Sequence, residues 1–242
     1  MSVSAYQLTD GRTVEELPFD EAMSRWKAGD GAFWIDAGSA ERASLEQVLD
    51  ELEVSEFLKA RSLQVGRSTI VLTVPNATFA TLPLYADRAK TRRVYGAAVC
   101  LPQLLLTFRA ESEGEQEQYL PRIEELELED GTTSSLLAAL LVRRVAATAA
   151  VAREVRDRLG ELAEQMDEDP TAVEPAVLER LKRRISLLDA IAEEQQEAVA
   201  LLAHARSAGF DPSAAVSYTH LTLPTMSTTG GGGGGGGRGG GG

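Results

Sequence analysis

Few of the residue types that build reactive sites are present in this chain. Among 242 residues there is one cysteine, Cys100, and there are two histidines, His204 and His220. A single cysteine excludes an internal disulfide bond and a cysteine-based zinc site, as is typical of cytosolic chains. A Ser-His-Asp arrangement or a histidine metal site would need residues from outside the visible body. The sequence therefore predicts no catalytic residues and a protein that is not an enzyme.

Basic residues are also in short supply. The chain has 24 Lys and Arg against 37 Asp and Glu, a formal net charge of −13. Nucleic-acid binding depends on Lys and Arg that neutralise phosphates, so we expect no nucleic-acid partner. Neither G-x-x-x-x-G-K-[ST] nor G-x-G-x-x-G occurs, which excludes nucleotide binding through either loop and leaves no predicted cofactor-binding residues. An acidic surface suits solubility and the attraction of cations.

Long apolar runs are missing as well. No stretch of about 18 uninterrupted apolar residues occurs, so no visible segment is predicted to span a membrane. Residues 1–10 lack the basic start and the apolar run of a signal peptide. We expect this part of the protein to be soluble.

The C-terminal residues have an unusual composition. Residues 216–225 read V-S-Y-T-H-L-T-L-P-T, which resembles a translated sequencing adapter, and residues 230–242 are all glycine except Arg238. A flexible linker or an expression scar is the alternative, and both interpretations exclude the segment from fold reasoning. We predict that the natural frame breaks off near Ala215. Residues 207–242 are then a disordered tail, artefactual from 216 onward.

Residues 1–110 alternate between strand and helix patterns and predict an α/β domain. Strands are expected at 3–8, 33–35, 69–74, 78–85, 92–101 and 104–108, and helices at 20–28, after Ser39, and at 54–63. The helix after Ser39 places Leu45, Val48, Leu49 and Leu52 on one face. The last two strands form a predicted hairpin that turns at Pro102 and Gln103.

The second half of the chain begins with charge and continues with helices. Residues 111–130 hold nine acids and one base, Arg122, which is typical of a solvated loop or helix face and defines an acidic connector at 111–131. Beyond it, apolar residues recur three or four apart in two long runs joined by a segment that contains Pro170 and Pro175. They predict an antiparallel helical hairpin at 132–206. The predicted seams consist of Leu137, Leu141, Val145, Thr148, Ala152, Val155, Leu159, Leu162 and Met166, and of Leu178, Leu181, Ile185, Leu188, Ala192, Gln195, Val199 and Leu202.

Several polar residues allow a functional and a structural interpretation. Glu193, Glu194 and the connector acids are candidate oxygen ligands for a hard cation, although exposed helix acids usually contact only water. Asn76 begins a glycosylation sequon but is interpreted as a turn residue. The basic cluster Arg88, Lys90, Arg92 and Arg93 is interpreted as a protected strand edge, with a contact to a neighbouring subunit as the alternative. The metal ligands, if any, remain unknown.

The order of these elements resembles the cytosolic region of the CorA-like divalent cation channels. The resemblance spans about residues 30–206 and is carried by F-W-I-D at 33–36, by L-L-L-T-F at 104–108 and by the hairpin with L-E-R-L-K-R-R-I at 178–185. It implies an α/β/α sandwich with a mixed sheet, followed by a long acidic antiparallel helical hairpin. The family's bridging carboxylate near the first helices has no counterpart, because the nearest stretch carries Ser62.

The resemblance also implies a function. The chain would be a truncated gating and regulatory domain of a transporter for Mg2+ or a similar divalent cation, with no tightly bound cofactor. The full-length protein would be a homopentamer held in the cell membrane by missing C-terminal helices, with this region in the cytoplasm. A soluble coiled-coil scaffold is the alternative, and an α/β enzyme whose active-site half is missing is a third.

Overall fold

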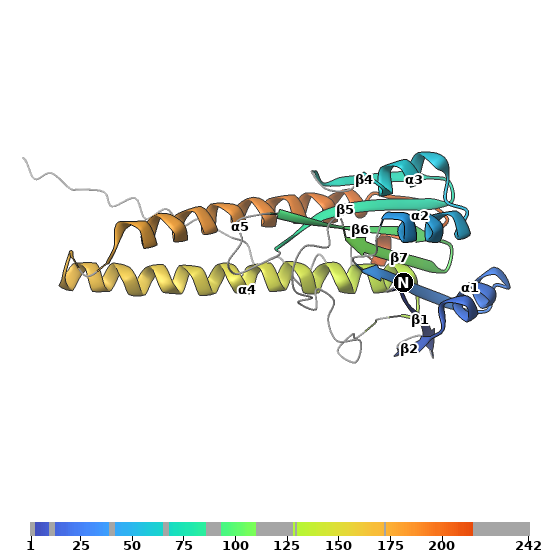
Figure 1. Ribbon diagram of the computed structural model, residues 1–242. Coiled ribbons are helices and arrows are strands. Elements are labelled where there is room, and N and C mark those ends of the chain that lie inside the picture. Colours follow the sequence, from blue (N-terminus) through green and yellow to red (C-terminus); the bar gives the residue numbers. More distant parts are fainter. Residues whose placement is uncertain are drawn as a thin grey trace, which may run out of the picture.

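A seven-stranded mixed sheet forms the centre of the molecule (Figure 1). The computed structural model describes residues 3–9, 13–38, 42–64, 68–85, 93–109, 128, 130–171 and 173–214. The strand order is β2-β1-β3-β7-β6-β5-β4, in which only β3 and β7 run parallel. The strands are β1 (Ser4–Thr9), β2 (Thr13–Leu17), β3 (Ala32–Gly38), β4 (Ile70–Val74), β5 (Ala77–Tyr85), β6 (Arg93–Leu101) and β7 (Leu104–Arg109).

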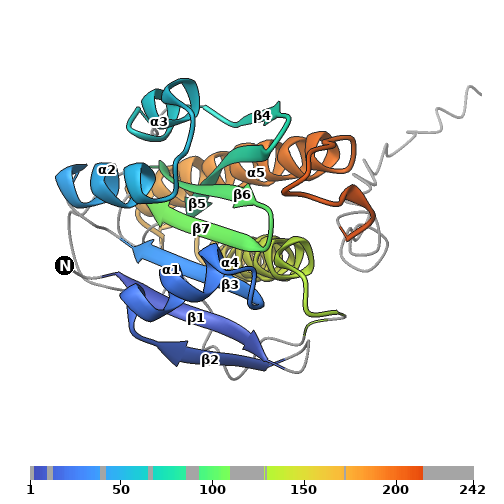
Figure 2. The same ribbon diagram turned by 90° about the vertical axis from the view of Figure 1, so that its right-hand side faces the viewer.

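Three short helices cover one face of the sheet and two long helices cover the other (Figure 2). The short helices are α1 (Phe19–Lys27), α2 (Arg42–Glu51) and α3 (Glu56–Ser62), and the long ones are α4 (Thr133–Glu168) and α5 (Pro175–Leu202). This arrangement confirms the predicted α/β/α sandwich with a helical hairpin. The predicted hairpin of β6 and β7 is also present, with Gln103 of its turn in the left-handed region at φ 58°.

Alternate residues of the central strands enter two separate apolar layers. In β3, Phe33 and Ile35 pack with the short helices, whereas Trp34 packs with the long ones. In β7, Leu104 and Leu106 face the first layer and Leu105 faces the second. Because both faces of the sheet are covered, each of these strands contains a continuous apolar run, residues 32–35 and 104–106, instead of alternating with polar residues.

One strand was not expected from the sequence. β2 pairs antiparallel with β1 and forms one edge of the sheet. Its sequence, T-V-E-E-L, carries two acids and only two apolar residues, Val14 and Leu17, both of which are half-buried. A short edge strand of this kind is recruited by the backbone hydrogen bonds of its neighbour, and its own side chains give little signal.

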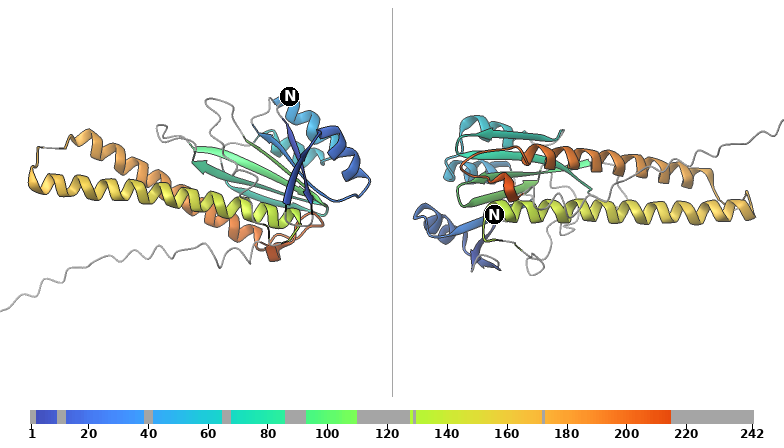
Figure 3. Two further views of the ribbon diagram at one scale, coloured as in Figure 1. Left: turned by 90° about the horizontal axis from the view of Figure 1, so that it is seen from below. Right: turned by 180° about the vertical axis from the view of Figure 1, so that it is seen from behind.

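The two long helices form an antiparallel hairpin that extends well beyond the sheet (Figure 3). The Thr132 side chain caps α4 by accepting a hydrogen bond from the Ser135 backbone N–H at 3.1 Å, and Pro175 opens α5 in the first turn, where its missing N–H costs nothing. All predicted seam positions are at least half-buried.

The seam of α5 shifts in its second half. Beyond Leu188 the fully buried residues are Ile191, Gln195, Ala198 and Leu202, whereas Ala192 and Val199 of the predicted seam are only half-buried. In this half α5 packs on β4 and β5 as well as on α4. Packing against the sheet therefore rotates the buried face of α5 away from the predicted seam. A heptad pattern alone does not predict this rotation.

The predicted boundary of the disordered tail at residue 207 is wrong. Residues 207–214 are described and packed, with Phe210 only 3% exposed and residues 212–214 helical. Phe210 fills an apolar site beneath the sheet, which stabilises this segment without any sequence periodicity. Residues 215–242 lie outside the described part of the chain, as does most of the acidic connector.

Among the described residues, one helix is long and apolar enough to cross a membrane by length and composition. This helix is α4, which contains an 18-residue window of mean hydropathy 1.7. Since 50% of that window is buried inside the domain, α4 has the character of a core helix.

Candidate functional site at the base of the helical hairpin

Gln195 joins the hairpin to the sheet from a fully buried position. Its Nε2 donates hydrogen bonds to the carbonyl oxygen of Pro83 in β5, at 2.9 Å, and to Oγ1 of Thr148 in α4, at 3.2 Å. The residue is 0% exposed, and its Oε1 has no hydrogen-bond partner among the described residues. One side chain thus ties α5, α4 and the sheet together, and it does so in a low-dielectric interior where an unmade bond is costly.

The preceding residue, Glu194, forms a second junction with the sheet. Tyr95 Oη and Thr69 Oγ1 each donate to Glu194 Oε2 at 3.0 Å, and Arg93 pairs with Oε1. Burial is the main cause that raises the pKa of Tyr95, so the phenol stays a neutral donor to the carboxylate. Glu194 is therefore engaged in holding α5 against the start of β6.

Arg93 is the one member of the predicted basic cluster among the described residues. It begins β6, where it pairs with Tyr85 of β5. Its guanidinium group pairs with Glu194 of α5 in the same chain. Arg88, Lys90 and Arg92 lie outside the described residues.

A half-buried carboxylate, Asp36, lies near the end of β3, on the side of the sheet that faces α4. Thr107 Oγ1 donates to Asp36 Oδ1 at 2.8 Å, and the Trp34 indole N–H donates to Thr107 Oγ1 at 2.9 Å. Burial raises the pKa of Asp36, and the Thr107 hydrogen bond and the positive charge of Arg109 oppose the rise. The three side chains form a continuous polar chain within an otherwise apolar layer.

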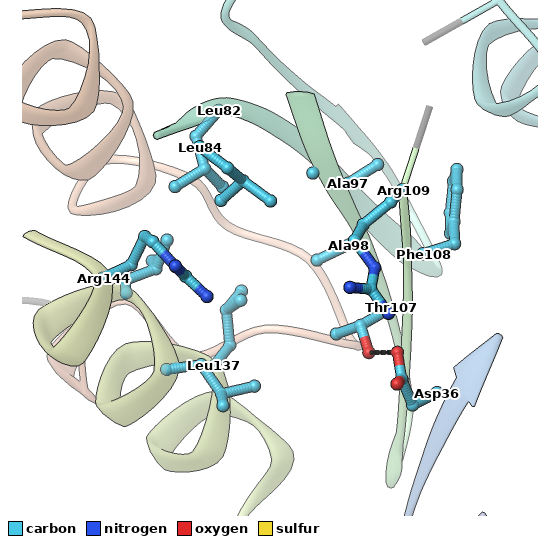
Figure 4. A pocket seen from close by; sticks show the side chains of 13 residues that line it. Asp36, Leu82, Leu84, Ala97, Ala98, Thr107, Phe108, Arg109, Leu137 and Arg144 are labelled. Atoms are coloured by element: carbon cyan, nitrogen blue, oxygen red, sulfur yellow. Dashed lines mark hydrogen bonds between the residues drawn. The ribbon is translucent and has the colours of Figure 1, made fainter. Parts of the chain in front are cut away.

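Asp36 and Thr107 form one wall of a small pocket of about 80 Å³ between the sheet and α4 (Figure 4). Leucines of β5 and α4, among them Leu84 and Leu137, line it together with small residues of β6 and Phe108. Arg109 and Arg144 reach toward it from β7 and α4. The lining contains one carboxylate, so it offers no ligand set for a divalent cation.

No metal centre is assembled by the described residues. They contain no group of three or more His, Cys, Asp and Glu side chains close enough to share an ion. Glu193 is exposed, whereas its neighbour Glu194 is taken up by Arg93. The connector acids at 111–127 and 129 lie outside the described part of the chain, so their role as ligands stays a prediction.

Other residues singled out in the sequence have structural positions. Ser62 is 2% exposed at the end of α3, and its hydroxyl has no partner among the described residues. Asn76 lies in the exposed turn between β4 and β5, and His204 is exposed after α5. Burial raises the pKa of the Cys100 thiol to about 12, which makes it unreactive at neutral pH.

The charge of the hairpin is concentrated at its tip. Residues 132–206 hold 13 acids and ten bases, so the hairpin as a whole carries a small net negative charge. Residues 157–179, around the tip, hold eight acids and one base. The negative field of the hairpin therefore lies far from the sheet, at its distal end.

The fold defines a class of domain in which a mixed α/β/α sandwich carries a long antiparallel helical hairpin on one face. A family model described as "CorA-like Mg2+ transporter protein" matches residues 29–223. The chain belongs to this family, which confirms the resemblance stated from the sequence. A sequence search of curated proteins gives no match.

Solved structures agree with this fold. The full-length CmaX protein superposes with a TM-score of 0.71 at 15% identity, and the complete CorA magnesium transporter from Methanocaldococcus jannaschii with 0.67 at 13%. Both comparisons cover 91% of this chain and 68% of the other. The soluble domain of CorA from the same organism gives a TM-score of 0.60 at 14% identity, covering 91% of this chain and 86% of that one.

Proposed function

We propose that this chain is the gating and regulatory region of a CorA-like transporter for Mg2+ or a similar divalent cation. The observation that carries the proposal is the family match over residues 29–223, together with a fold like that of a CorA soluble domain. Membership of a transporter family favours a transport protein over the enzyme and the scaffold considered from the sequence. The pore itself would be formed by membrane helices from sequence beyond these 242 residues.

The assembly that we propose is a homopentamer with this region in the cytoplasm. The hairpins would surround the entrance to the pore, and the acids of residues 157–179 would raise the local concentration of divalent cations there. Such a field acts at long range, is screened over about 8 Å at physiological salt, and needs no dehydrated ion site. Selectivity would reside in the membrane part.

The α/β sandwich would act as the body that positions the hairpin. Gln195 and Glu194 supply polar links from α5 to β5, to β6 and to Thr69 just before β4, so a shift of the sheet is passed directly to the helix. Interfaces of this kind change between discrete packings instead of deforming continuously.

The decisive test is the genomic sequence past codon 215. Two apolar runs of about 20 residues would support the transporter. An immediate stop codon would contradict it in favour of the scaffold, and a soluble domain with a nucleophile or a metal motif would contradict it in favour of the enzyme.

A biochemical test uses the chain by itself. Titration calorimetry with Mg2+ at physiological salt should give weak, non-saturating binding, because the tip acids are exposed and form no octahedral cage. Light scattering should give no stable pentamer, because the helices that we expect to hold the ring are absent. A saturable site at low micromolar Mg2+, or a Mg2+-dependent pentamer, would contradict this and indicate ligands in the connector.

A further inference from the structure

The segment after α5 turns back and packs tightly on the end of the sheet. Phe210 is 3% exposed and belongs to the same apolar cluster as Leu105 of β7 and Leu136 of α4. Gly209 allows the close approach, because a Cβ there would lie 2.4 Å from the carbonyl oxygen of Cys100 in β6. No side chain larger than hydrogen fits at this contact without moving the backbone.

Hydrogen bonds also hold the same segment to β5 and to the turn that precedes β5. The Ala208 N–H donates to the carbonyl oxygen of Pro75, in the turn between β4 and β5, at 3.0 Å. The hydroxyl groups of Ser207 and Thr78 of β5 lie 2.9 Å apart and share a hydrogen bond. Residues 207–211, here called the anchor, are thus bound to the turn after β4, to β5 and to β6.

The anchor ends at the beginning of a helix. Asp211 Oδ1 accepts the backbone N–H of Ser213 at 2.9 Å, Pro212 occupies the first helical position, and residues 212–214 are helical. An Asp N-cap followed by Pro is a strong helix start. The Asp211 N–H donates to Oγ of Ser134, in the first turn of α4, at 2.9 Å. The first turns of two helices are therefore joined by one hydrogen bond.

We propose that the anchor is a coupling element that fixes the origin of the helix starting at residue 212 to the sheet and to the first turn of α4. The sandwich, the base of the hairpin and the first turn of that helix then move as one body. Its purpose rests on the proposed function, since in a transporter this helix would carry motion of the sandwich toward the membrane. Its geometry does not depend on that function.

Hydrogen exchange on the full 242-residue chain tests the anchor. Gly209→Ala should raise exchange at residues 208–214 at least about tenfold, because the added Cβ forces the segment off β6 and frees its hydrogen bonds. Gly160→Ala is the matched control, since a Cβ at Gly160 has nothing within 4 Å, and it should leave these amides unchanged. Unchanged exchange in Gly209→Ala would overturn the anchor.

A milder variant covers the case in which Gly209→Ala does not fold. Ser134→Ala removes only the acceptor of the Asp211 N–H, so it should speed exchange at residues 211–214 about tenfold while the near-ultraviolet circular dichroism stays unchanged. Equal exchange in Ser134→Ala and the wild type would show that the two helix starts are not coupled through this bond.

The coupling itself is measured with a spin-label pair at Gln47→Cys, an exposed position of α2 in the sandwich, and at the exposed Ser213→Cys. The buried Cys100 stays unlabelled. A narrow distance distribution that broadens at least twofold in Gly209→Ala, but not in Gly160→Ala, supports a single body. A distribution that Gly209→Ala leaves narrow overturns it. Since neither readout involves ion flux, a full-length protein that failed to transport would contradict the proposed function alone.

Discussion

The two halves of the helical hairpin follow the same heptad spacing but are stabilised by different partners. Near the sheet, Leu136, Leu141 and Leu202 belong to the large apolar cluster that includes Trp34 and Leu105. Toward the tip, the two helices pack around a small separate cluster of Ala152, Val155 and Leu188, with partly buried apolar residues against it. The comparison shows that equal sequence periodicity does not mean equal stability, because burial against a third element adds to the helix pair.

Polar contacts differ between the two halves in the same direction. The proximal half buries Gln195 and Thr148 in a hydrogen-bonded link to β5. The distal half relies on ion pairs such as Arg156 with Asp189, whose side chains are 46% and 44% exposed. Exposed pairs contribute little to stability, so we expect the tip to open independently of the base.

The largest expected effect comes from emptying the proximal core. Leu136 is 0% exposed between α4 and the sheet, so Leu136→Ala should lower the free energy of unfolding by about 3–5 kcal/mol. Urea denaturation followed by circular dichroism measures the loss. Leu201→Ala, at an apolar residue of the same hairpin base that is 43% exposed, is the control and should cost well under 1 kcal/mol. Similar losses for both variants would contradict the proposed packing.

The distal core should respond more locally. Leu188 is 0% exposed, and Leu188→Ala should cost about 2–4 kcal/mol, seen mainly as faster hydrogen exchange in the tip with the sheet still protected. Changing the half-buried Leu159 to Ala should lower the free energy of unfolding by less than Leu188→Ala does. Changing the exposed Glu164 to Ala should leave it almost unchanged. If Leu188→Ala weakened the sheet as strongly as the tip, the two halves would form one cooperative unit and the comparison would fail.

The polar link at the junction should have an intermediate effect. Gln195→Ala leaves the Pro83 carbonyl and Thr148 without their donor and opens a cavity, so we expect a loss of about 1–3 kcal/mol in urea denaturation. Gln195→Met, which keeps the volume, should recover part of it. The exposed neighbour provides the control, and a loss in Gln196→Ala equal to that in Gln195→Ala would exclude a specific role for the link.

Asp36 of β3, which lies beside the proximal half of the hairpin, should make the stability of the protein depend on pH. Because burial raises its pKa, the folded state holds a proton more tightly than the unfolded state, so this residue lowers stability as pH rises from its ordinary pKa through the raised value. Asp36→Asn removes this contribution. The stability of the variant relative to wild type should therefore increase with pH across the mildly acidic range, in urea denaturation at several pH values.

Asp130 should change the stability with pH in the opposite direction to Asp36. Burial opposes the shift, but hydrogen bonds from Ser135 and Thr132 lower its pKa, so its stabilising contribution is present above the ordinary value and is lost as pH falls through the folded one. The stability of Asp130→Asn relative to wild type should decrease as pH rises. The same pH trend in both variants would contradict the two assignments.

The smallest expected effect is a gain in the distal half. A Cβ on Gly160 of α4 meets nothing within 4 Å, so Gly160→Ala should stabilise the tip by about 0.5–1 kcal/mol through lower backbone entropy in the unfolded state. At Gly96 of β6 a Cβ would lie 3.0 Å from the Leu84 side chain, so Gly96→Ala should not share this gain. Thermal denaturation of both variants measures whether the added methyl group stabilises the protein at Gly160 and not at Gly96.

Local patterns in the sequence predicted most of the elements. The heptad spacing of Leu137 to Met166 located α4, and the apolar runs around Trp34 and Leu105 located the central strands. The site was less accessible, because Gln195 could be recognised only as a polar residue on an apolar seam. Its partner Pro83 is 112 residues away, and the partners of Glu194 are up to 125 residues away, so no local signal connects them.

The sequence by itself determined the helical hairpin, the alternation of strands and helices before it, and the family, because periodicity, caps and turns act over a few residues. The tertiary structure alone decided which face of α5 is buried beyond Leu188, that β2 joins the sheet, and that residues 207–214 pack instead of forming a tail. These features depend on surfaces that exist only after distant strands have paired. Gly209 shows the difference most clearly, since only its approach to Cys100 makes a side chain impossible there.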